Sequence, residues 1–207
     1  MGLFRVNFFR FIAVTAIVIM FAGCAHTIRS ADIPLLQTGS PLKGIKPKTF
    51  AFKEFRDARS RGTDALWVGQ IAALKQKIDQ PVAVVVGMAI RKELERNGHI
   101  CIDYSPQSKA DFIIEGTVFK YWFYVERGGT AFVLTSRFVG NVAVKLTVSN
   151  TSPDKGVLIK SYEGESLTEI FMALPRGKAA LVTLSQAQLA MVKEISTDSE
   201  LIEFLEK

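Results

Sequence analysis

The stretch Phe138-Val-Gly-Asn-Val-Ala-Val-Lys-Leu-Thr-Val148 determines the fold class, because its apolar and polar residues alternate with a period of two. One face carries small or apolar residues, at Phe138, Gly140, Val142, Val144, Leu146 and Val148. The opposite face carries Asn141, Lys145 and Thr147. Because successive side chains of a strand point to opposite sides of its sheet, the stretch predicts a strand with one buried face.

Further strands are predicted on both sides of this stretch, because similar apolar runs are bounded by turn residues. These strands, together with the one that contains the stretch, cover residues 49–55, 99–104, 110–125, 131–149 and 157–168. Turns at 126–129 and 150–156 separate the last three strands. Strands joined by such short turns are expected to pair as neighbours in an antiparallel meander.

Two helical segments accompany the strands. The first follows Pro81, which suits the opening turn of a helix, and ends at Asn97-Gly98, which suits a left-handed cap. Its apolar residues recur three or four positions apart, at Val82, Val85, Val86, Ala89, Ile90 and Leu94. The second has a face formed by Leu181, Leu184, Met191, Val192 and Ile195, with Gln188 as a polar exception. The spacing Thr197-x-x-Glu200 predicts a capping box that begins a last short helix.

These elements predict a single domain over residues 48–207. Its fold class is α+β, a two-layer sandwich in which two main helices pack on one face of a mainly antiparallel sheet. Residues 24–47 contain several Pro, Gly, Ser and Thr residues and show no sustained period. They predict a flexible tether with an average span of about 25–30 Å.

The residues before the tether predict a lipoprotein signal peptide over residues 1–23. Two arginines, Arg5 and Arg10, precede an apolar run at 11–22 that is shorter than the roughly 20 residues of a spanning helix. The run closes on Phe21-Ala-Gly-Cys24, which resembles a bacterial lipobox. In a lipobox a diacylglyceryl group alkylates the cysteine thiol and the preceding peptide is removed. Two alternatives stay open, an uncleaved membrane anchor and ordinary cleavage after Gly23 or Ala25.

Lipid on Cys24 would hold the protein firmly at a membrane. Each buried methylene contributes about 0.8 kcal/mol, and two or three acyl chains such as palmitate bind almost irreversibly. Ala25 follows the cysteine, whereas Asp at that position resembles a signal for retention in the inner membrane. The sequence therefore favours the periplasmic side of the outer membrane of a Gram-negative bacterium.

The composition argues against a nucleic-acid partner and against an intramolecular disulfide. The chain has 26 basic and 20 acidic residues, and the leader holds two of the basic ones, which leaves a net charge of +4 after processing. The basic residues are scattered, and we expect no nucleic-acid partner for an exported protein. With Cys24 lipidated, Cys101 is alone within Ile100-Cys-Ile102. We expect it to be a small buried apolar residue rather than a reactive thiol.

No arrangement of residues typical of catalysis or metal binding is found in the sequence. The two histidines, His26 and His99, lack acidic or cysteine neighbours at metal-ligand spacing. The chain also lacks a Gly-x-Ser-x-Gly elbow, a phosphate loop and a dinucleotide fingerprint. Glu163, Glu165 and Glu169 share one side of a predicted strand, which favours a solvated face over acid–base catalysis. We therefore expect no enzymatic activity, no metal and no cofactor.

The segment Phe119-Lys-Tyr-Trp-Phe-Tyr-Val125 places apolar residues on both faces of its strand. As core residues and cross-strand pairs they require no function. The alternative is a partner surface, because Trp and Tyr combine a large apolar area with a polar tip and are enriched at interfaces. The residues of this candidate surface are Tyr121, Trp122, Tyr124 and Phe132. The nearby lipid anchor makes contact of these aromatics with the membrane a further option.

A pattern of a helix followed by strands runs through five segments, Glu93–His99, Lys109–Val118, Gly140–Val148, Ser161–Gly164 and Met191–Leu205. Together they resemble the YajG-like family of bacterial envelope lipoproteins. The resemblance covers about residues 80–207 and implies a small outer-membrane lipoprotein without catalytic residues. Similar patterns occur in transport-auxiliary and lipopolysaccharide-assembly lipoproteins.

The sequence thus predicts a non-enzymatic lipoprotein, anchored in the outer membrane, that binds another protein of the cell envelope. The alternative is a lipid-handling or transport-auxiliary lipoprotein, in which the sheet and helices hold an acyl chain or contact a transporter.

Overall fold

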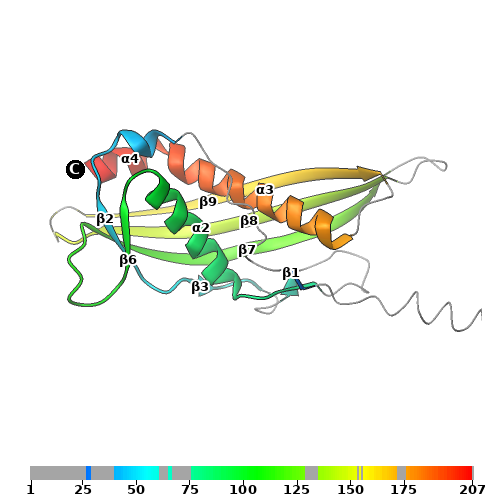
Figure 1. Ribbon diagram of the computed structural model, residues 1–207, viewed down its shortest axis with the longest axis horizontal. Coiled ribbons are helices and arrows are strands. Elements are labelled where there is room, and N and C mark those ends of the chain that lie inside the picture. Colours follow the sequence, from blue (N-terminus) through cyan, green and yellow to red (C-terminus); the bar gives the residue numbers. More distant parts are fainter. Residues whose placement is uncertain are drawn as a thin grey trace, which may run out of the picture.

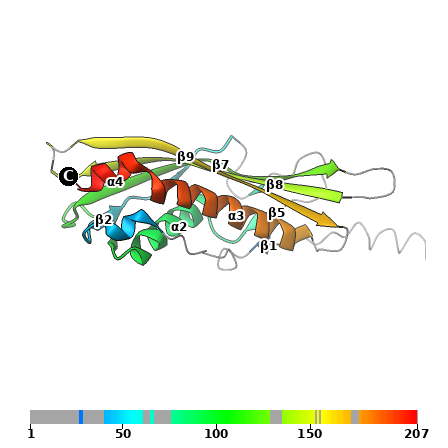
Figure 2. The ribbon, with the colours of Figure 1, turned by 90° about the horizontal axis from the view of Figure 1, so that it is seen from above.

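The described part of the protein is built from a long mixed sheet of six strands with helices packed on one of its faces, and from a small second sheet of three short strands (Figures 1 and 2). The computed structural model describes residues 27–28, 40–60, 65–66, 76–128, 135–152, 154, 156–171 and 176–206. The predicted signal peptide, Cys24 and Phe132 lie outside these described residues. The prediction of an α+β fold with its helices on one sheet face is confirmed.

Three long strands form the antiparallel part of the sheet, namely β7 (Phe112–Gly128), β8 (Thr135–Asn150) and β9 (Val157–Phe171). The central strand β8 pairs with β7 on one side and with β9 on the other. The core face predicted for the stretch 138–148 is confirmed, because each of its even-numbered residues is buried. Alternation with a period of two therefore described this strand correctly.

The rest of the sheet is parallel, and here the prediction of a meander is wrong. Strand β2 (Thr49–Phe52) lies between β6 (Ile100–Asp103) and β7, and it is parallel to both. The short β3 (Arg56–Asp57) pairs in parallel with β7 further along. Parallel neighbours require a long crossover connection. The chain between β2 and β6, which contains the first main helix, provides that connection.

This helix, α2 (Val82–Arg96), begins after Pro81 as predicted. It ends at Asn97, and Gly98 follows with a φ of 90°, the left-handed conformation that glycine adopts most easily. The six apolar residues that recur three or four positions apart are all buried. The amphipathic pattern therefore identified the side of α2 that packs on the sheet.

The second main helix, α3 (Arg176–Thr197), packs mainly over β8 and β9. Leu184, Ala187 and Met191 on its sheet-facing side have no exposed surface. The polar exception Gln188 is also buried, at 3% exposure, and the hydroxyl of Tyr121 donates a hydrogen bond to its Oε1 at 3.5 Å. The interface between α3 and the sheet therefore includes polar contacts as well as apolar ones.

The last helix, α4 (Ser199–Glu206), is not capped in the way that the sequence predicts. Its cap is Asp198, whose carboxylate accepts a hydrogen bond from the backbone N–H of Glu200 at 3.0 Å. Tyr162 and Lys160 also donate to this carboxylate, at 2.7 and 2.9 Å. Burial favours the neutral acid, yet these hydrogen bonds hold the pKa of Asp198 below its usual value. The ionised Asp198 therefore replaces Thr197 as the cap.

Two parts of the predicted tether, residues 24–47, pack on the domain instead of hanging free. Near its start, β1 (Thr27–Ile28) pairs in parallel with β5 (Gln76–Ile78), to which β4 (Ala65–Leu66) is antiparallel. Near its end, a short 3-10 helix, η2 (Pro41–Gly44), inserts Leu42 into the core with no exposed surface. The burial of Leu42 helps to offset the loss of chain freedom in this part of the segment.

A buried histidine lies at the start of β6. His99 is 4% exposed, and the backbone N–H of Lys48 donates to its Nδ1 at 3.3 Å. The ring meets Phe50 edge-on, with 5.4 Å between the ring centroids. Burial lowers the pKa of His99 below its ordinary value of 6.5; the carbonyl of Leu42 opposes this shift and the charge of Lys48 adds to it.

We expect the free energy of unfolding to decrease as the pH falls below 6.5, the ordinary pKa of histidine. The unfolded chain then binds a proton at His99 that the folded chain does not, which gives a slope of up to about 1.4 kcal/mol per pH unit. The pKa values of Asp57 and Asp198 are lowered from 3.8, so these two groups change the free energy of unfolding only when the pH approaches 3.8 or falls below it. Urea unfolding at pH 7.5, 6.5 and 5.5 measures the slope. His99→Gln should remove most of it, and equal slopes in both proteins would contradict the assignment.

Candidate functional site

A bulge in β7 decides which of its aromatic side chains face the helices. The register with β8 shifts between Val118 and Lys120. Before the shift the even-numbered residues are buried, and after it the odd-numbered Tyr121 and Phe123 are buried. One extra residue in a strand reverses its alternation. Trp122 and Tyr124 therefore lie on the sheet face that is turned away from the helices, which we call the open face.

The described residues that the sequence predicted to form one partner surface therefore lie on opposite faces of the sheet. Tyr121 has no exposed surface, and burial raises the pKa of its hydroxyl. It belongs to the core and cannot form part of a partner surface, so this part of the prediction is wrong. Trp122 and Tyr124 are half-buried on the open face, and Phe132 is not described.

Trp122 and Tyr124 belong to an apolar area that crosses three strands. Tyr124 lies directly opposite Val139 of β8, which lies opposite Leu167 of β9. Leu167 is 55% exposed. We call Trp122, Tyr124, Val139 and Leu167 the aromatic patch. No described helix lies on the open face (Figure 2), so the patch is accessible from that side of the sheet as far as the described residues extend.

Charged residues of β9 border the aromatic patch. Lys120 pairs with Glu163 at 2.6 Å, and Arg137 pairs with Glu169 at 2.8 Å. The amide of Asn141 donates to Glu163 at 2.7 Å and to Glu165 at 2.8 Å. The bonds from Lys120 and Asn141 hold the pKa of Glu163 below its usual value. The prediction that the three glutamates form a solvated strand face is confirmed, since all are exposed.

Asn141 lies on the open face, as the sequence predicts, but its burial was not expected. It is only 6% exposed although it alternates with the core residues of β8. Cross-strand pairing places it between Trp122 and Glu165. It therefore connects the aromatic patch to the glutamates, a role that alternation alone does not reveal.

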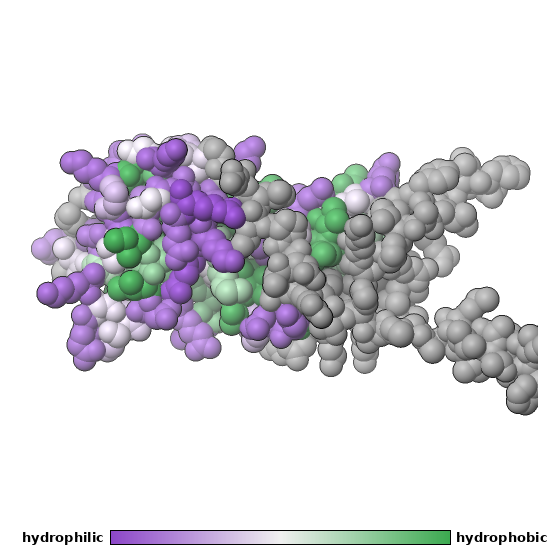
Figure 3. Space-filling view, viewed as in Figure 1, coloured by the Kyte–Doolittle hydropathy of each residue, from purple (hydrophilic) through white to green (hydrophobic). Residues whose placement is uncertain are grey.

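A second candidate surface is a groove of about 1040 Å³ between α2, the chain from β2 to β3, and Tyr104. Its apolar lining includes Phe52, Phe55, Val84 and Met88, and the last two are each 40% exposed. Seen from the helix side, apolar surface lies over β6 and beside α2 within a largely hydrophilic surface (Figure 3). The groove is therefore a site of partly exposed apolar side chains.

Phe55 shapes the floor of this groove. Its ring stacks on Phe52 with 6.2 Å between centroids and lies against Gly87 of α2 and Gly116 of β7. A Cβ atom on Gly116 would approach the ring to 2.2 Å, so only glycine leaves room for it. Phe55 lies in the segment between β2 and β3, whose registers with β7 differ by one residue.

Two of the cationic side chains that line the groove, Arg91 and Lys53, form ion pairs. Arg91 binds Asp103 at 2.6 Å, and its guanidinium lies 5.0 Å from the centroid of the Phe52 ring. Lys53 pairs with Glu115, and this hydrogen bond raises the pKa of the lysine. The groove therefore presents apolar surface with balanced charge, and it does not select a strongly charged ligand.

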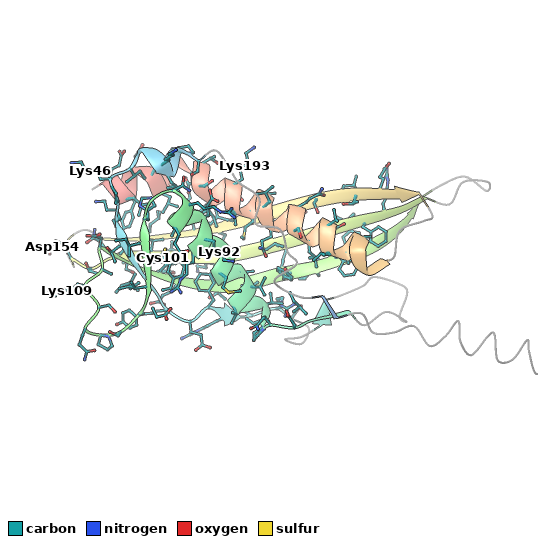
Figure 4. All side chains as sticks on the ribbon, in the orientation of Figure 1. Lys46, Lys92, Cys101, Lys109, Asp154 and Lys193 are labelled. Carbon is teal, nitrogen blue, oxygen red and sulfur yellow. The ribbon has the colours of Figure 1, made fainter. Side chains whose placement is uncertain are left out.

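Cys101 lies on β6 beside α2 (Figure 4), where its thiol donates to the backbone oxygen of Arg91 at 3.7 Å. The residue is half-buried, and burial raises its pKa to about 12. The thiol is therefore protonated at neutral pH and is a poor nucleophile. Among the described residues, no group of three His, Cys, Asp or Glu side chains is placed to hold a metal ion.

Comparisons with known proteins show the fold. No family model and no curated protein matches the sequence. The structure of a Xanthomonas campestris protein of the family DUF330 covers 77% of this chain and 85% of its own, with a TM-score of 0.50 and 12% identity. At this identity the likeness shows a shared fold and says nothing of activity.

Two further solved structures are less similar. One is a minor lipoprotein from Acinetobacter baumannii, with a TM-score of 0.40, 8% identity, and coverage of 73% of this chain and 92% of its own. The other is described as a candidate lipoprotein from Caulobacter crescentus, with a TM-score of 0.36, 10% identity, and coverage of 73% and 88%. Both TM-scores are below 0.5, so the likeness to these two structures is weak. No helix in the described part of the chain is long and apolar enough to cross a membrane.

Proposed function

We propose that this protein is a non-enzymatic lipoprotein of the cell envelope that binds another envelope protein through the aromatic patch. Lipid on Cys24 anchors it at the periplasmic side of the outer membrane of a Gram-negative bacterium. One observation carries the binding role. Trp122, Tyr124, Val139 and Leu167 come together on the sheet face that no described helix covers.

The chemistry of the patch suits recognition of a protein. Aromatic side chains supply a large contact area and are enriched in the buried centres of interfaces. Leu167, with 55% of its surface exposed, extends the apolar area to the edge strand. The ion pairs Lys120–Glu163 and Arg137–Glu169 lie beside it. An apolar centre with a polar rim is the usual composition of such an interface.

The anchor and the family are part of the same proposal. They are supported by the lipobox-like Phe21-Ala-Gly-Cys24 after a short apolar run, and by the resemblance of residues 80–207 to YajG-like lipoproteins. An anchored protein meets its partners at high local concentration, so a modest patch is sufficient for binding.

Replacing both Trp122 and Tyr124 by Ala should reduce capture of the partner in a crosslinking pull-down from cells by more than about tenfold. Two aromatic residues at the centre of an interface usually contribute at least about 2 kcal/mol of binding free energy. The matched control is Lys145→Ala, since Lys145 is exposed on the same face but lies outside the patch. Unchanged capture by a double variant that unfolds at the wild-type temperature would refute the patch as the binding surface.

The groove beside α2 favours a second candidate function, that of a lipid-handling or transport-auxiliary lipoprotein. Val84 and Met88 offer partly exposed apolar surface next to Phe52 and Phe55, and apolar surface of this kind suits an acyl chain. Native mass spectrometry of the purified protein separates the two candidates. Co-purified lipid that is lost in Met88→Glu would favour lipid handling, and a lipid-free groove would favour protein binding alone.

A further inference from the structure

The first described residues of the chain are fixed to the body of the domain. Thr27 and Ile28 pair with Lys77 and Ile78 of β5. Ile78 is 6% exposed and belongs to the core, and β1 also contacts α3. The position of Thr27 is therefore set by the fold and not by a free tether.

Cys24 precedes Thr27 by three residues, and three extended residues span at most about 11 Å. The headgroup layer on each side of a bilayer is itself only about 5–8 Å thick. If the acyl chains on Cys24 are in the bilayer, β1 must lie at the headgroups or just outside them. A free tether of residues 25–47 would instead place the domain about 25–30 Å away on average.

Most of the described domain lies to one side of this point along the long axis, while the ends of β7, β8 and β9 extend past β1 on the other side (Figure 1). In both views β1 lies beside the N-terminal half of α3, whereas η2 and α4 lie at the other end of that helix (Figures 1 and 2). Ser40, which precedes η2, donates to the backbone oxygen of Ser196 near the C-terminus of α3 at 3.3 Å. The 22 residues of α3 span roughly 33 Å. The two ends of the domain therefore lie at different distances from β1.

We propose that the β1 edge of the domain rests on the membrane surface, with β1 and β5 at the lipid headgroups and with η2 and α4 directed away from the bilayer. This inference rests on the lipidation of Cys24 in the proposed function. Beyond lipidation, the inference states that the domain has a fixed orientation on the lipid surface. The aromatic patch lies toward the ends of β7 and β9 that are on the β1 half of the molecule (Figure 1). A partner must therefore reach the patch close to the membrane.

Energy transfer to the bilayer tests this orientation in the full acylated protein. The purified protein is placed in vesicles of phosphatidylethanolamine and phosphatidylglycerol that contain a headgroup-labelled acceptor. A donor dye is attached to Gln80→Cys or to Lys46→Cys, both in a Cys101→Ser background. Gln80 is exposed and follows Ile78 of β5 by two residues, whereas Lys46 is exposed and lies at the opposite end of the molecule (Figure 4).

Transfer from position 80 should exceed transfer from position 46 by at least about threefold, because the length of α3 alone separates the two ends by roughly 30 Å. A spacer of 12 Gly and Ser residues, inserted after Ala25, should bring the ratio to about one, since it adds roughly 20 Å of flexible chain. Equal transfer without the spacer, or a ratio that persists with it, would overturn the inference.

The mass of the N-terminal peptide separates this inference from the proposed function. A diacylglyceryl-modified Cys24 together with equal transfer from both positions would refute the orientation and leave the anchor intact. An unmodified Cys24 would refute the anchor, and the inferred orientation with it.

Discussion

Gly164→Ala is expected to lower the free energy of unfolding by about 3 kcal/mol or more, because the new methyl group has no space. A Cβ atom at this position of β9 would lie 2.0 Å from the carbonyl oxygen of Ala187 and 2.3 Å from the backbone nitrogen of Met191. Both atoms belong to the backbone of α3, which cannot move aside as a flexible side chain can. The helix would have to lift off the sheet, and the side chains of Ala187 and Met191, which are now fully buried, would lose contacts.

Thermal unfolding measures this effect directly. For a domain of this size a loss of about 3 kcal/mol lowers the unfolding temperature by roughly 6–12 °C. Gly44→Ala is the matched control, since no atom lies within 4 Å of the added Cβ, and we expect a change within about 0.5 kcal/mol. If Gly164→Ala unfolds at the wild-type temperature, the backbone of α3 does not lie this close to Gly164 of β9.

Cys24→Ser is expected to abolish lipidation completely. The lipobox reaction alkylates a thiol, and a serine hydroxyl is a far weaker nucleophile. In wild type the N-terminal peptide should begin at Cys24 and carry a diacylglyceryl group; in the variant that mass should be absent. Because each buried methylene contributes about 0.8 kcal/mol, loss of two or three acyl chains removes the whole anchor.

Mass spectrometry of the N-terminal peptide is the measurement, and the other cysteine supplies the control. Cys101→Ser should keep the lipid in full, because Cys101 lies on β6 within the folded domain. A lipid-modified Cys24→Ser protein would contradict the assignment of Cys24. A wild-type protein that begins at Cys24 or His26 without lipid would instead support ordinary cleavage after Gly23 or Ala25.

Much of the secondary structure could be predicted from local patterns. The helix from Pro81 to Asn97 has apolar residues at spacings of three and four, and all of them are buried in α2. The strand around 138–148 has small or apolar residues at every second position, and it lies between β7 and β9 in the sheet. In both elements the side chains of one face contact the core, so the period of the sequence reports directly on burial.

The order of the strands was not predictable in the same way. The parallel insertion of β2 between β6 and β7 depends on contacts between segments about 50 residues apart, such as Phe50 beside Cys101. A helix between two short strands is the pattern of a parallel crossover, and that signal was available between residues 49 and 103. The pairing of β1 with β5 is likewise set by packing and not by a local pattern.

The candidate partner surface shows which features the sequence determined and which features only the tertiary structure decided. By itself the sequence determined that residues 119–125 form an aromatic strand, that residues 138–148 bury one face, and that Cys24 ends a lipobox-like leader. Only the tertiary structure decided that Tyr121 is buried while Trp122 and Tyr124 reach the open face. The reason is the bulge after Val118. It arises because two residues of β7 face one residue of β8, and the number of residues opposite one another is a property of the pair of strands and not of either strand alone.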